Sequence, residues 1–185
     1  QLPPDSVPVA LTAPLRDRQR AAVLRQLEMT REQLKLHQLF GTAGITYVTL
    51  KGLPLAQRYY GNAGLRTSKD IDVLVAPHQL DAAEAALLAA GYVPDDGFDR
   101  ITPRQRIHWL KAFHHCSFAA PGSGALIELH WRPVNYPDIL PSVTPGLEAA
   151  PRDQVVLGGV PIPLLPADDM LLYLCTHGTM HFWFR

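Results

Sequence analysis

The stretch that decides the fold is Ser68-Lys69-Asp70-Ile71-Asp72-Val73-Leu74-Val75. It starts polar and becomes continuously apolar, which is typical of a strand that enters a core from an exposed mouth. Asp70 and Asp72 are separated by one residue, so on a strand their carboxylates project from the same face. Two such anions repel each other unless a cation lies between them or one is protonated. The pair therefore suits Mg²⁺ or Mn²⁺ together with substrate phosphate oxygens, and the alternative is a turn-capping Asp beside an exposed one.

A third acid lies in the segment Ile127-Glu128-Leu129-His130-Trp131. Its apolar residues predict a strand, on which Glu128 shares a face with His130 and not with Leu129. A lone Glu in this setting is also typical of an edge strand that faces water. Together with Asp70 and Asp72, it would complete a three-carboxylate cluster on adjacent strands, the arrangement that two-metal phosphoryl transfer requires. We expect His130 to support that cluster or to contact a phosphate.

Groups that could bind phosphate precede the acids. In Thr49-Leu50-Lys51-Gly52-Leu53, the glycine allows a close backbone approach to a ligand, and Lys51 supplies a positive charge. The helix expected to follow would present its N-terminus to an anion. Arg66, Ser68 and Lys69 lie just before the acids and could hold a triphosphate. The alternative for Lys51-Gly52 is an ordinary turn that leads into a helix.

The remaining elements are predicted from periodicity and from turn residues. The pattern predicts a long helix over 15–40, with an apolar stripe formed by Leu24, Leu27, Leu34, Leu36 and Leu39. It then predicts a strand over 45–50, helices over 54–60 and 77–90, a polar loop over 95–106, hairpins over 114–131 and 155–165, and a helix that begins at Pro166. The predicted class is α+β, a small mixed sheet flanked by helices.

Composition excludes some functions. The 185 residues carry 17 Lys and Arg against 17 Asp and Glu, so the formal net charge is zero. This argues against a coater of long nucleic acid or a membrane-surface protein. No apolar run approaches the roughly 18 residues that cross a bilayer, so we expect a cytoplasmic protein. Cys116 and Cys175 lie in apolar stretches and predict two buried free thiols.

Histidines form a second group of interest among the eight in the chain. His114 and His115 fall on the strand expected beside His130, where alternation lets only one of them face the same way. His177 and His181 are four apart on a predicted helix and share a face, so they could bind a transition metal. We favour packing or hydrogen bonding of His177 near the acidic site. For the aromatic residues Trp131, Phe182 and Trp183, we expect core positions.

Several of these segments together resemble the uncharacterised nucleotidyltransferase family of the polymerase-β-like superfamily. They are Leu50–Tyr60, Leu65-Arg66, Asp70–Val75, Ile127–Trp131 and Leu174–His181, and the resemblance runs from about Leu24 to the end. It implies a minimal nucleotidyltransferase fold that moves a nucleoside monophosphate from an NTP to an acceptor. By matching position, it implies that Asp70 and Asp72 are paired metal ligands and that Glu128 is the base or metal partner for the acceptor hydroxyl.

The chain departs from the superfamily pattern at three points. Lys51-Gly52 stands where the superfamily usually has Gly-Ser or Gly-Gly, the gap from Gly52 to Asp70 is longer than usual, and the third acid is Glu rather than Asp. The leading hypothesis is a metal-dependent nucleotidyltransferase that acts on a small molecule, a protein side chain or an RNA end. The alternatives are a non-catalytic nucleotide-binding or interaction module, and a metal-dependent hydrolase that uses histidines with Asp70 and Asp72.

The expected organisation is an N-terminal arm over 1–14, a nucleotidyltransferase-like core over 15–165, and the start of a C-terminal helical region over 166–185. The chain ends on the apolar run His181-Phe-Trp-Phe-Arg185. Free aromatic side chains at an end are costly to expose. We therefore expect an N-terminal fragment of a longer protein, or a homo-oligomer in which a second copy covers this end.

Overall fold

The computed structural model describes residues 8–66, 68–136, 139–140 and 152–182. Within them, one mixed sheet of seven strands has the order β3-β4-β5-β2-β1-β7-β6. The strands are β1 (Tyr47–Thr49), β2 (Asp70–Val75), β3 (Val93–Pro94), β4 (His115–Ala119), β5 (Leu126–His130), β6 (Asp153–Leu157) and β7 (Val160–Leu164). The pairs β2–β5 and β1–β7 are parallel, and the other neighbours are antiparallel. The predicted mixed sheet, the strand over 70–75 and both hairpins are confirmed.

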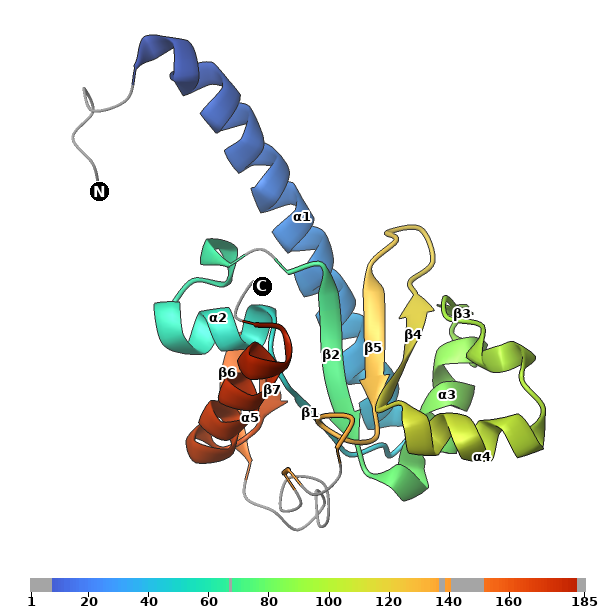
Figure 1. Ribbon diagram of the computed structural model, residues 1–185. Helices are drawn as coiled ribbons and strands as arrows, with labels where there is room; N and C mark the ends of the chain where they lie inside the picture. The colour runs from blue at the N-terminus through green and yellow to red at the C-terminus, as the bar shows by residue number, and fades with distance from the viewer. Residues whose placement is uncertain (1–7, 67, 137–138, 141–151, 183–185) are drawn as a thin grey trace.

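Helices cover both faces of the sheet, as Figure 1 shows. The long α1 (Val9–Thr42) and α3 (Leu80–Ala89) pack on one face, against the side chains of Ile71, Val73 and Val75. On the other face, α5 (Ala167–Met180) packs Met170 and Tyr173 against Leu74 and its neighbours. Because side chains alternate along β2, Asp70 and Asp72 stand on the α5 face with Leu74.

The N-terminal helix is longer than the sequence predicted. It begins at Val9, so residues 9–14 of the predicted arm are helical, and residues 1–7 lie outside the described residues. Proline content misled the prediction: Pro8 stands at the N-cap, where a missing N–H costs little, and Pro14 lies inside the helix.

The predicted stripe on this helix is only partly right. Leu36 is fully buried, but Leu24 and Leu27 are more than 60 % exposed. The N-terminal half of α1 extends past the sheet (Figure 1), so it has no layer to pack against. The buried face runs instead through Met29, Leu36 and Phe40.

The predicted loop over 95–106 is wrong, because it contains a short 3-10 helix (Phe98–Arg100) and the start of α4 (Pro103–Ala112). Thr102 caps α4 by accepting from the Gln105 backbone, and the Gln105 side chain accepts from the Thr102 N–H, so the two form a capping box. The signal was present as Thr-Pro-x-Gln. The segment is polar because α4 has no buried residue, so it lacks the apolar periodicity from which a helix is predicted.

The other helices agree with the predictions within a few residues. They are α2 (Leu53–Tyr60), α3 and α5, and short 3-10 turns follow α2 at Ala63–Leu65 and precede α3 at Pro77–Gln79. Of the two cysteines, Cys116 is buried as predicted and Cys175 is exposed. Trp131 is buried as predicted, whereas Phe182 is 79 % exposed and Trp183 lies outside the described residues.

None of the helices in the described residues combines the length and the apolarity that a membrane crossing needs.

Substitutions along α1 test which half carries the packing. We expect Leu36→Ala to lower the free energy of unfolding by about 2–5 kcal/mol, because it leaves a cavity under the sheet. The same change at exposed Leu24 should cost less than about 0.5 kcal/mol. Urea unfolding of both variants measures this, and equal losses would contradict the packing described here.

Candidate active site

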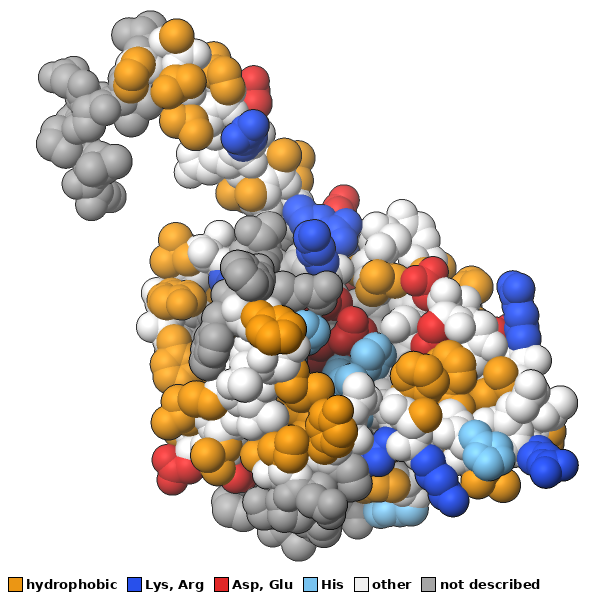
Figure 2. Space-filling view, viewed as in Figure 1, with side chains coloured by type: hydrophobic (Ala, Val, Ile, Leu, Met, Phe, Trp, Pro, Cys, Tyr) orange, Lys and Arg blue, Asp and Glu red, His pale blue; other side chains and the backbone are white. Residues whose placement is uncertain are grey.

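Pairing of two strands brings the predicted acids together. In the parallel β2–β5 ladder, Asp72 lies opposite Glu128 and Leu74 lies opposite His130. Because both strands alternate in phase, Asp72, Glu128 and His130 share the α5 face of the sheet. Figure 2 shows acidic and histidine side chains gathered near the centre of the visible face.

The close group consists of Asp72, Glu128 and His130, whose ligand atoms lie within 4.8 Å of one another. His130 Nε2 is 3.4 Å from Asp72 Oδ1 and 3.4 Å from Glu128 Oε2. Asp72 is fully buried, the His130 side chain is 3 % exposed, and the Glu128 side chain is 22 % exposed. Solvent therefore reaches the group at Glu128.

Asp70 stands apart from this close group. It is half-buried at the start of β2 and is not among the residues whose ligand atoms lie within 4.8 Å of one another. Burial raises its pKa, and so does the negative charge of Asp72. Positive charges on Lys51 and Arg66 oppose this rise. Asp70 is therefore a carboxylate at the mouth of the site, two residues from a buried one.

Lys51 supplies the nearest positive charge. The Leu50 N–H donates to the Asp72 carbonyl at 3.1 Å, which holds the end of β1 beside β2. The next side chain, Lys51, places its Nζ 3.0 Å from Asp72 Oδ1 and 3.4 Å from His177 Nε2. Burial opposes the charged form of Lys51, but the surrounding carboxylates, Asp72 first, raise its pKa overall. The ammonium predicted to meet a phosphate is paired with an acid here.

Gly52 makes this turn possible. Its φ is +80° and its ψ is −145°, a conformation that is essentially restricted to glycine. A Cβ at this position would lie 3.3 Å from Ser68 Oγ and 3.7 Å from the Asp70 carbonyl oxygen. The turn therefore lies directly against the entrance of β2.

The residues before β2 are mainly held by their backbone. The buried Ser68 hydroxyl donates to the Asp70 carbonyl at 2.8 Å. From α1, Gln26 donates to the Arg66 carbonyl at 3.0 Å and Arg25 to the Lys69 carbonyl at 3.4 Å. The side chain of Lys69 is exposed and that of Arg66 is half-buried. Of the phosphate-binding residues predicted from the sequence, the structure brings only Lys51 and His130 into contact with the buried acid.

The charges within the group compensate one another. Although burial works against ionisation, His130 and Asp72 bring the pKa of Glu128 down to about 2. Burial also works against the charged imidazole of His130, but Asp72 and Glu128 outweigh it and raise its pKa. The site is thus a cluster of carboxylates whose negative charge is partly balanced by Lys51 and His130.

Both neighbouring histidines join His130, which corrects the expectation that only one would. His115 lies opposite His130 in the β4–β5 ladder. His114 precedes β4, so strand alternation does not govern it, and its ring centroid lies 5.3 Å from that of His130. Burial is the main cause that lowers the pKa of both, that of His114 to about 3.

The α5 helix adds Tyr173, a side chain that the sequence analysis did not place in the site. Tyr173 is fully buried, and burial together with the nearby carboxylates raises its pKa well above the usual value. His177, one turn later, contacts Lys51, in line with the predicted position near the acids. The i, i+4 spacing of the two residues was the available signal. The His177 and His181 ring centroids lie 4.4 Å apart.

The donor atoms of this group fit a divalent cation. Both carboxylate oxygens of Asp72 and both ring nitrogens of His130 are buried, and none has a hydrogen-bond partner of normal geometry within the described residues. Buried polar groups are rarely left in this state. Carboxylate oxygens suit Mg²⁺ or Mn²⁺, and an added imidazole suits transition metals.

A family model described as uncharacterised nucleotidyltransferase matches residues 1–185. The chain belongs to this nucleotidyltransferase family. The resemblance drawn from the sequence is confirmed, and the mixed sheet with flanking helices is consistent with a nucleotidyltransferase fold. Comparison with curated proteins and with solved structures finds no match.

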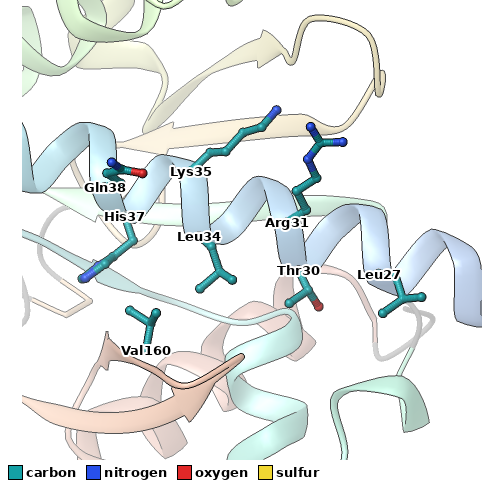
Figure 3. Close-up of a pocket in the computed structure, with 8 residues that line it drawn as sticks. All are labelled: Leu27, Thr30, Arg31, Leu34, Lys35, His37, Gln38 and Val160. Carbon is teal, nitrogen blue, oxygen red and sulfur yellow. The ribbon is translucent and has the colours of Figure 1, made fainter.

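A separate groove in the nucleotidyltransferase lies along α1. Its volume is about 660 Å³, and the side chains of Leu34 and Val160 face each other across it (Figure 3). The lining residues are Leu27, Thr30, Arg31, Leu34, Lys35, His37, Gln38 and Val160. They include no carboxylate, unlike the close group on the α5 face.

Replacing Gly52 tests the turn. We expect Gly52→Ala to lower the free energy of unfolding by about 1–3 kcal/mol, because alanine strongly disfavours this φ and ψ. Gly41→Ala is the matched control: Gly41 lies in α1 with nothing within 4 Å of an added Cβ, so the change should be neutral or stabilising by up to about 1 kcal/mol. Thermal and urea unfolding compare the two, and a harmless Gly52→Ala would refute the assigned conformation.

Removing Lys51 and removing the charge of Asp72 should lower the free energy of unfolding by different amounts. We expect Lys51→Met to cost roughly 3 kcal/mol, because it leaves a fully buried carboxylate without its cation. Asp72→Asn should cost less, since the amide is neutral and similar in shape, and the double variant should recover part of the loss. A urea-unfolding double-mutant cycle measures the coupling, and additive losses would show that the pair is not coupled.

Proposed function

We propose that this nucleotidyltransferase moves a nucleoside monophosphate from an NTP to an acceptor, using a divalent cation held by Asp72 and Glu128. The observation that carries the proposal is the buried Asp72 carboxylate, which faces Glu128 across a parallel ladder and lacks normal hydrogen bonds. A bound Mg²⁺ or Mn²⁺ would neutralise charge on the phosphates and on the attacking oxygen. Asp70, at the mouth, is the remaining carboxylate of the proposed ligand set.

The proposed roles of the other residues follow from their positions. Glu128 is the most accessible member of the close group, so it is the one that an acceptor hydroxyl could reach. Lys51, with a side chain that is 14 % exposed, could exchange its contact with Asp72 for a phosphate oxygen. Arg66 and Lys69 would attract the triphosphate at the mouth, while Ser68 and Gly52 shape the backbone there. We propose a small molecule, a protein side chain or an RNA end as the acceptor.

One observation favours the non-catalytic alternative. Lys51 Nζ already lies at ion-pair distance from Asp72, so the ammonium balances part of the charge that a metal ion would balance. A nucleotide-binding module that lost catalysis would be expected to retain such a pair. Binding and transfer therefore have to be measured separately.

Ligand-induced stabilisation tests binding. At an NTP concentration 100 times Kd, the ligand should stabilise the protein by about 2.7 kcal/mol, a rise in Tm of about 5–10 °C. The rise should need Mg²⁺ or Mn²⁺ and should be lost in Asp72→Asn. The control Asp99→Asn, at an exposed acid on another part of the chain, should behave like the unmodified protein. If no NTP raises the Tm in the presence of Mg²⁺ or Mn²⁺, the proposal is wrong.

Transfer is tested with labelled NTP and a cell extract as the source of acceptors. A label that moves to an acceptor in the presence of Mg²⁺ or Mn²⁺, and not with Asp72→Asn or Glu128→Gln, supports the enzyme. NTP binding without any transfer supports the non-catalytic module.

A further inference from the structure

Three histidines meet beside the acidic group. His115 on β4 and His130 on β5 lie opposite each other in an antiparallel pair, and His114 precedes β4. One ring nitrogen from each lies within 4.8 Å of the others. The ring centroids of His115 and His130 are 4.9 Å apart, and those of His114 and His115 are 4.6 Å apart.

The outer nitrogen of His114 is oriented by an amide. His114 Nδ1 faces Asn135 Oδ1, an oxygen that can only accept, and this contact favours the tautomer with the proton on Nδ1 and a free lone pair on Nε2. His114 Nε2 lies 3.3 Å from His115 Nδ1. Metal-ligating histidines are usually oriented in this way, with the second nitrogen bonded to an oxygen.

His130 repeats the arrangement with carboxylates in place of the amide. Its Nε2 lies 3.4 Å from both Asp72 and Glu128, and its Nδ1 is buried with no hydrogen-bond partner in the described part of the chain. A hydrogen bond between His114 and His115 alone would leave that buried nitrogen unsatisfied. A cation shared by the three rings would satisfy it.

The spacing also suits a small transition-metal ion. Zn²⁺ binds imidazole nitrogen at about 2.0–2.1 Å in tetrahedral sites, which places two such nitrogens about 3.3–3.4 Å apart. The 3.3 Å between His114 Nε2 and His115 Nδ1 agrees with that separation. His114 and His115 are half-buried, so an ion can reach them from solvent.

We propose that His114, His115 and His130 bind a transition-metal ion of the Zn²⁺ class, at a site beside the acidic group that shares only His130 with it. Three imidazoles favour Zn²⁺, Co²⁺ or Ni²⁺, whereas Mg²⁺ prefers oxygen ligands. The site does not depend on nucleotidyl transfer, so it stands or falls separately from the proposed function.

Metal titration tests the site. Titration with Zn²⁺, followed by calorimetry, and with Co²⁺, followed by visible absorption, should show one ion per chain that excess Mg²⁺ does not displace. His114→Ala and His115→Ala should each weaken Zn²⁺ binding at least about tenfold, and Asn135→Ala by about 10–100-fold through loss of orientation. His108→Ala, an exposed histidine on α4, should bind like the unmodified protein.

Further variants separate this site from the acids. Asp72→Asn should retain the ion with at most about a tenfold loss, because Asp72 would only orient His130. Loss of the ion in Asp72→Asn together with full binding in His115→Ala would place it among the acids and overturn the proposal. Failure of the unmodified protein to bind Zn²⁺ or Co²⁺ would do the same. Circular dichroism checks folding, and His114→Gln and His115→Gln serve where an alanine variant does not fold.

Discussion

A carboxylate buried in the face of a sheet dictates much of this structure. Asp72 is fully buried and lacks normal hydrogen bonds among the described residues, and an isolated charge in that position would be very costly. The surroundings offset this cost with the Lys51 ammonium at 3.0 Å and the His130 imidazole at 3.4 Å. Lys51 reaches it because β1 pairs with β2 and then turns sharply at Gly52. The buried charge of Asp72 is therefore balanced through the β1–β2 pairing and the turn at Gly52, which together place Lys51 beside it.

The two faces of the sheet differ in what they bury: one is covered by an apolar layer, and the other carries both apolar packing and the acidic group. On one face, α1 and α3 bury an apolar layer that includes Val73 and Val75. On the other face, α5 covers only part of the sheet and presents both Tyr173 to the apolar cluster and His177 to Lys51. Because Asp72 and Leu74 point to the same face, one end of that face carries charge and the other carries apolar packing. Residues of α5 thus help to hold the site in place.

The strand that carries the acids was predictable, and its partners were not. A period of two placed Asp70 and Asp72 on one face and Glu128 beside His130, and the structure agrees. Local pattern says nothing about register across a parallel ladder, so the separation of Asp70 from the close group emerged only in three dimensions. For the same reason, the sequence did not predict that Lys51 lies 3.0 Å from Asp72. The capping box of α4 is present in the sequence, but the helix that it starts has no apolar stripe, because none of its residues is buried.

His130 lies where the two groups of metal-binding side chains meet, since it belongs to both. A divalent ion on its Nδ1 side would make the Nε2 proton more acidic and would strengthen its donation to Asp72 and Glu128. The same contact orients the ring, so the acids would in turn improve the histidine as a ligand. A change at His130 would disturb both groups together, whereas changes at His114 and His115 act from the far side of the ring. The two groups therefore share a single imidazole, so a change to this ring acts on both.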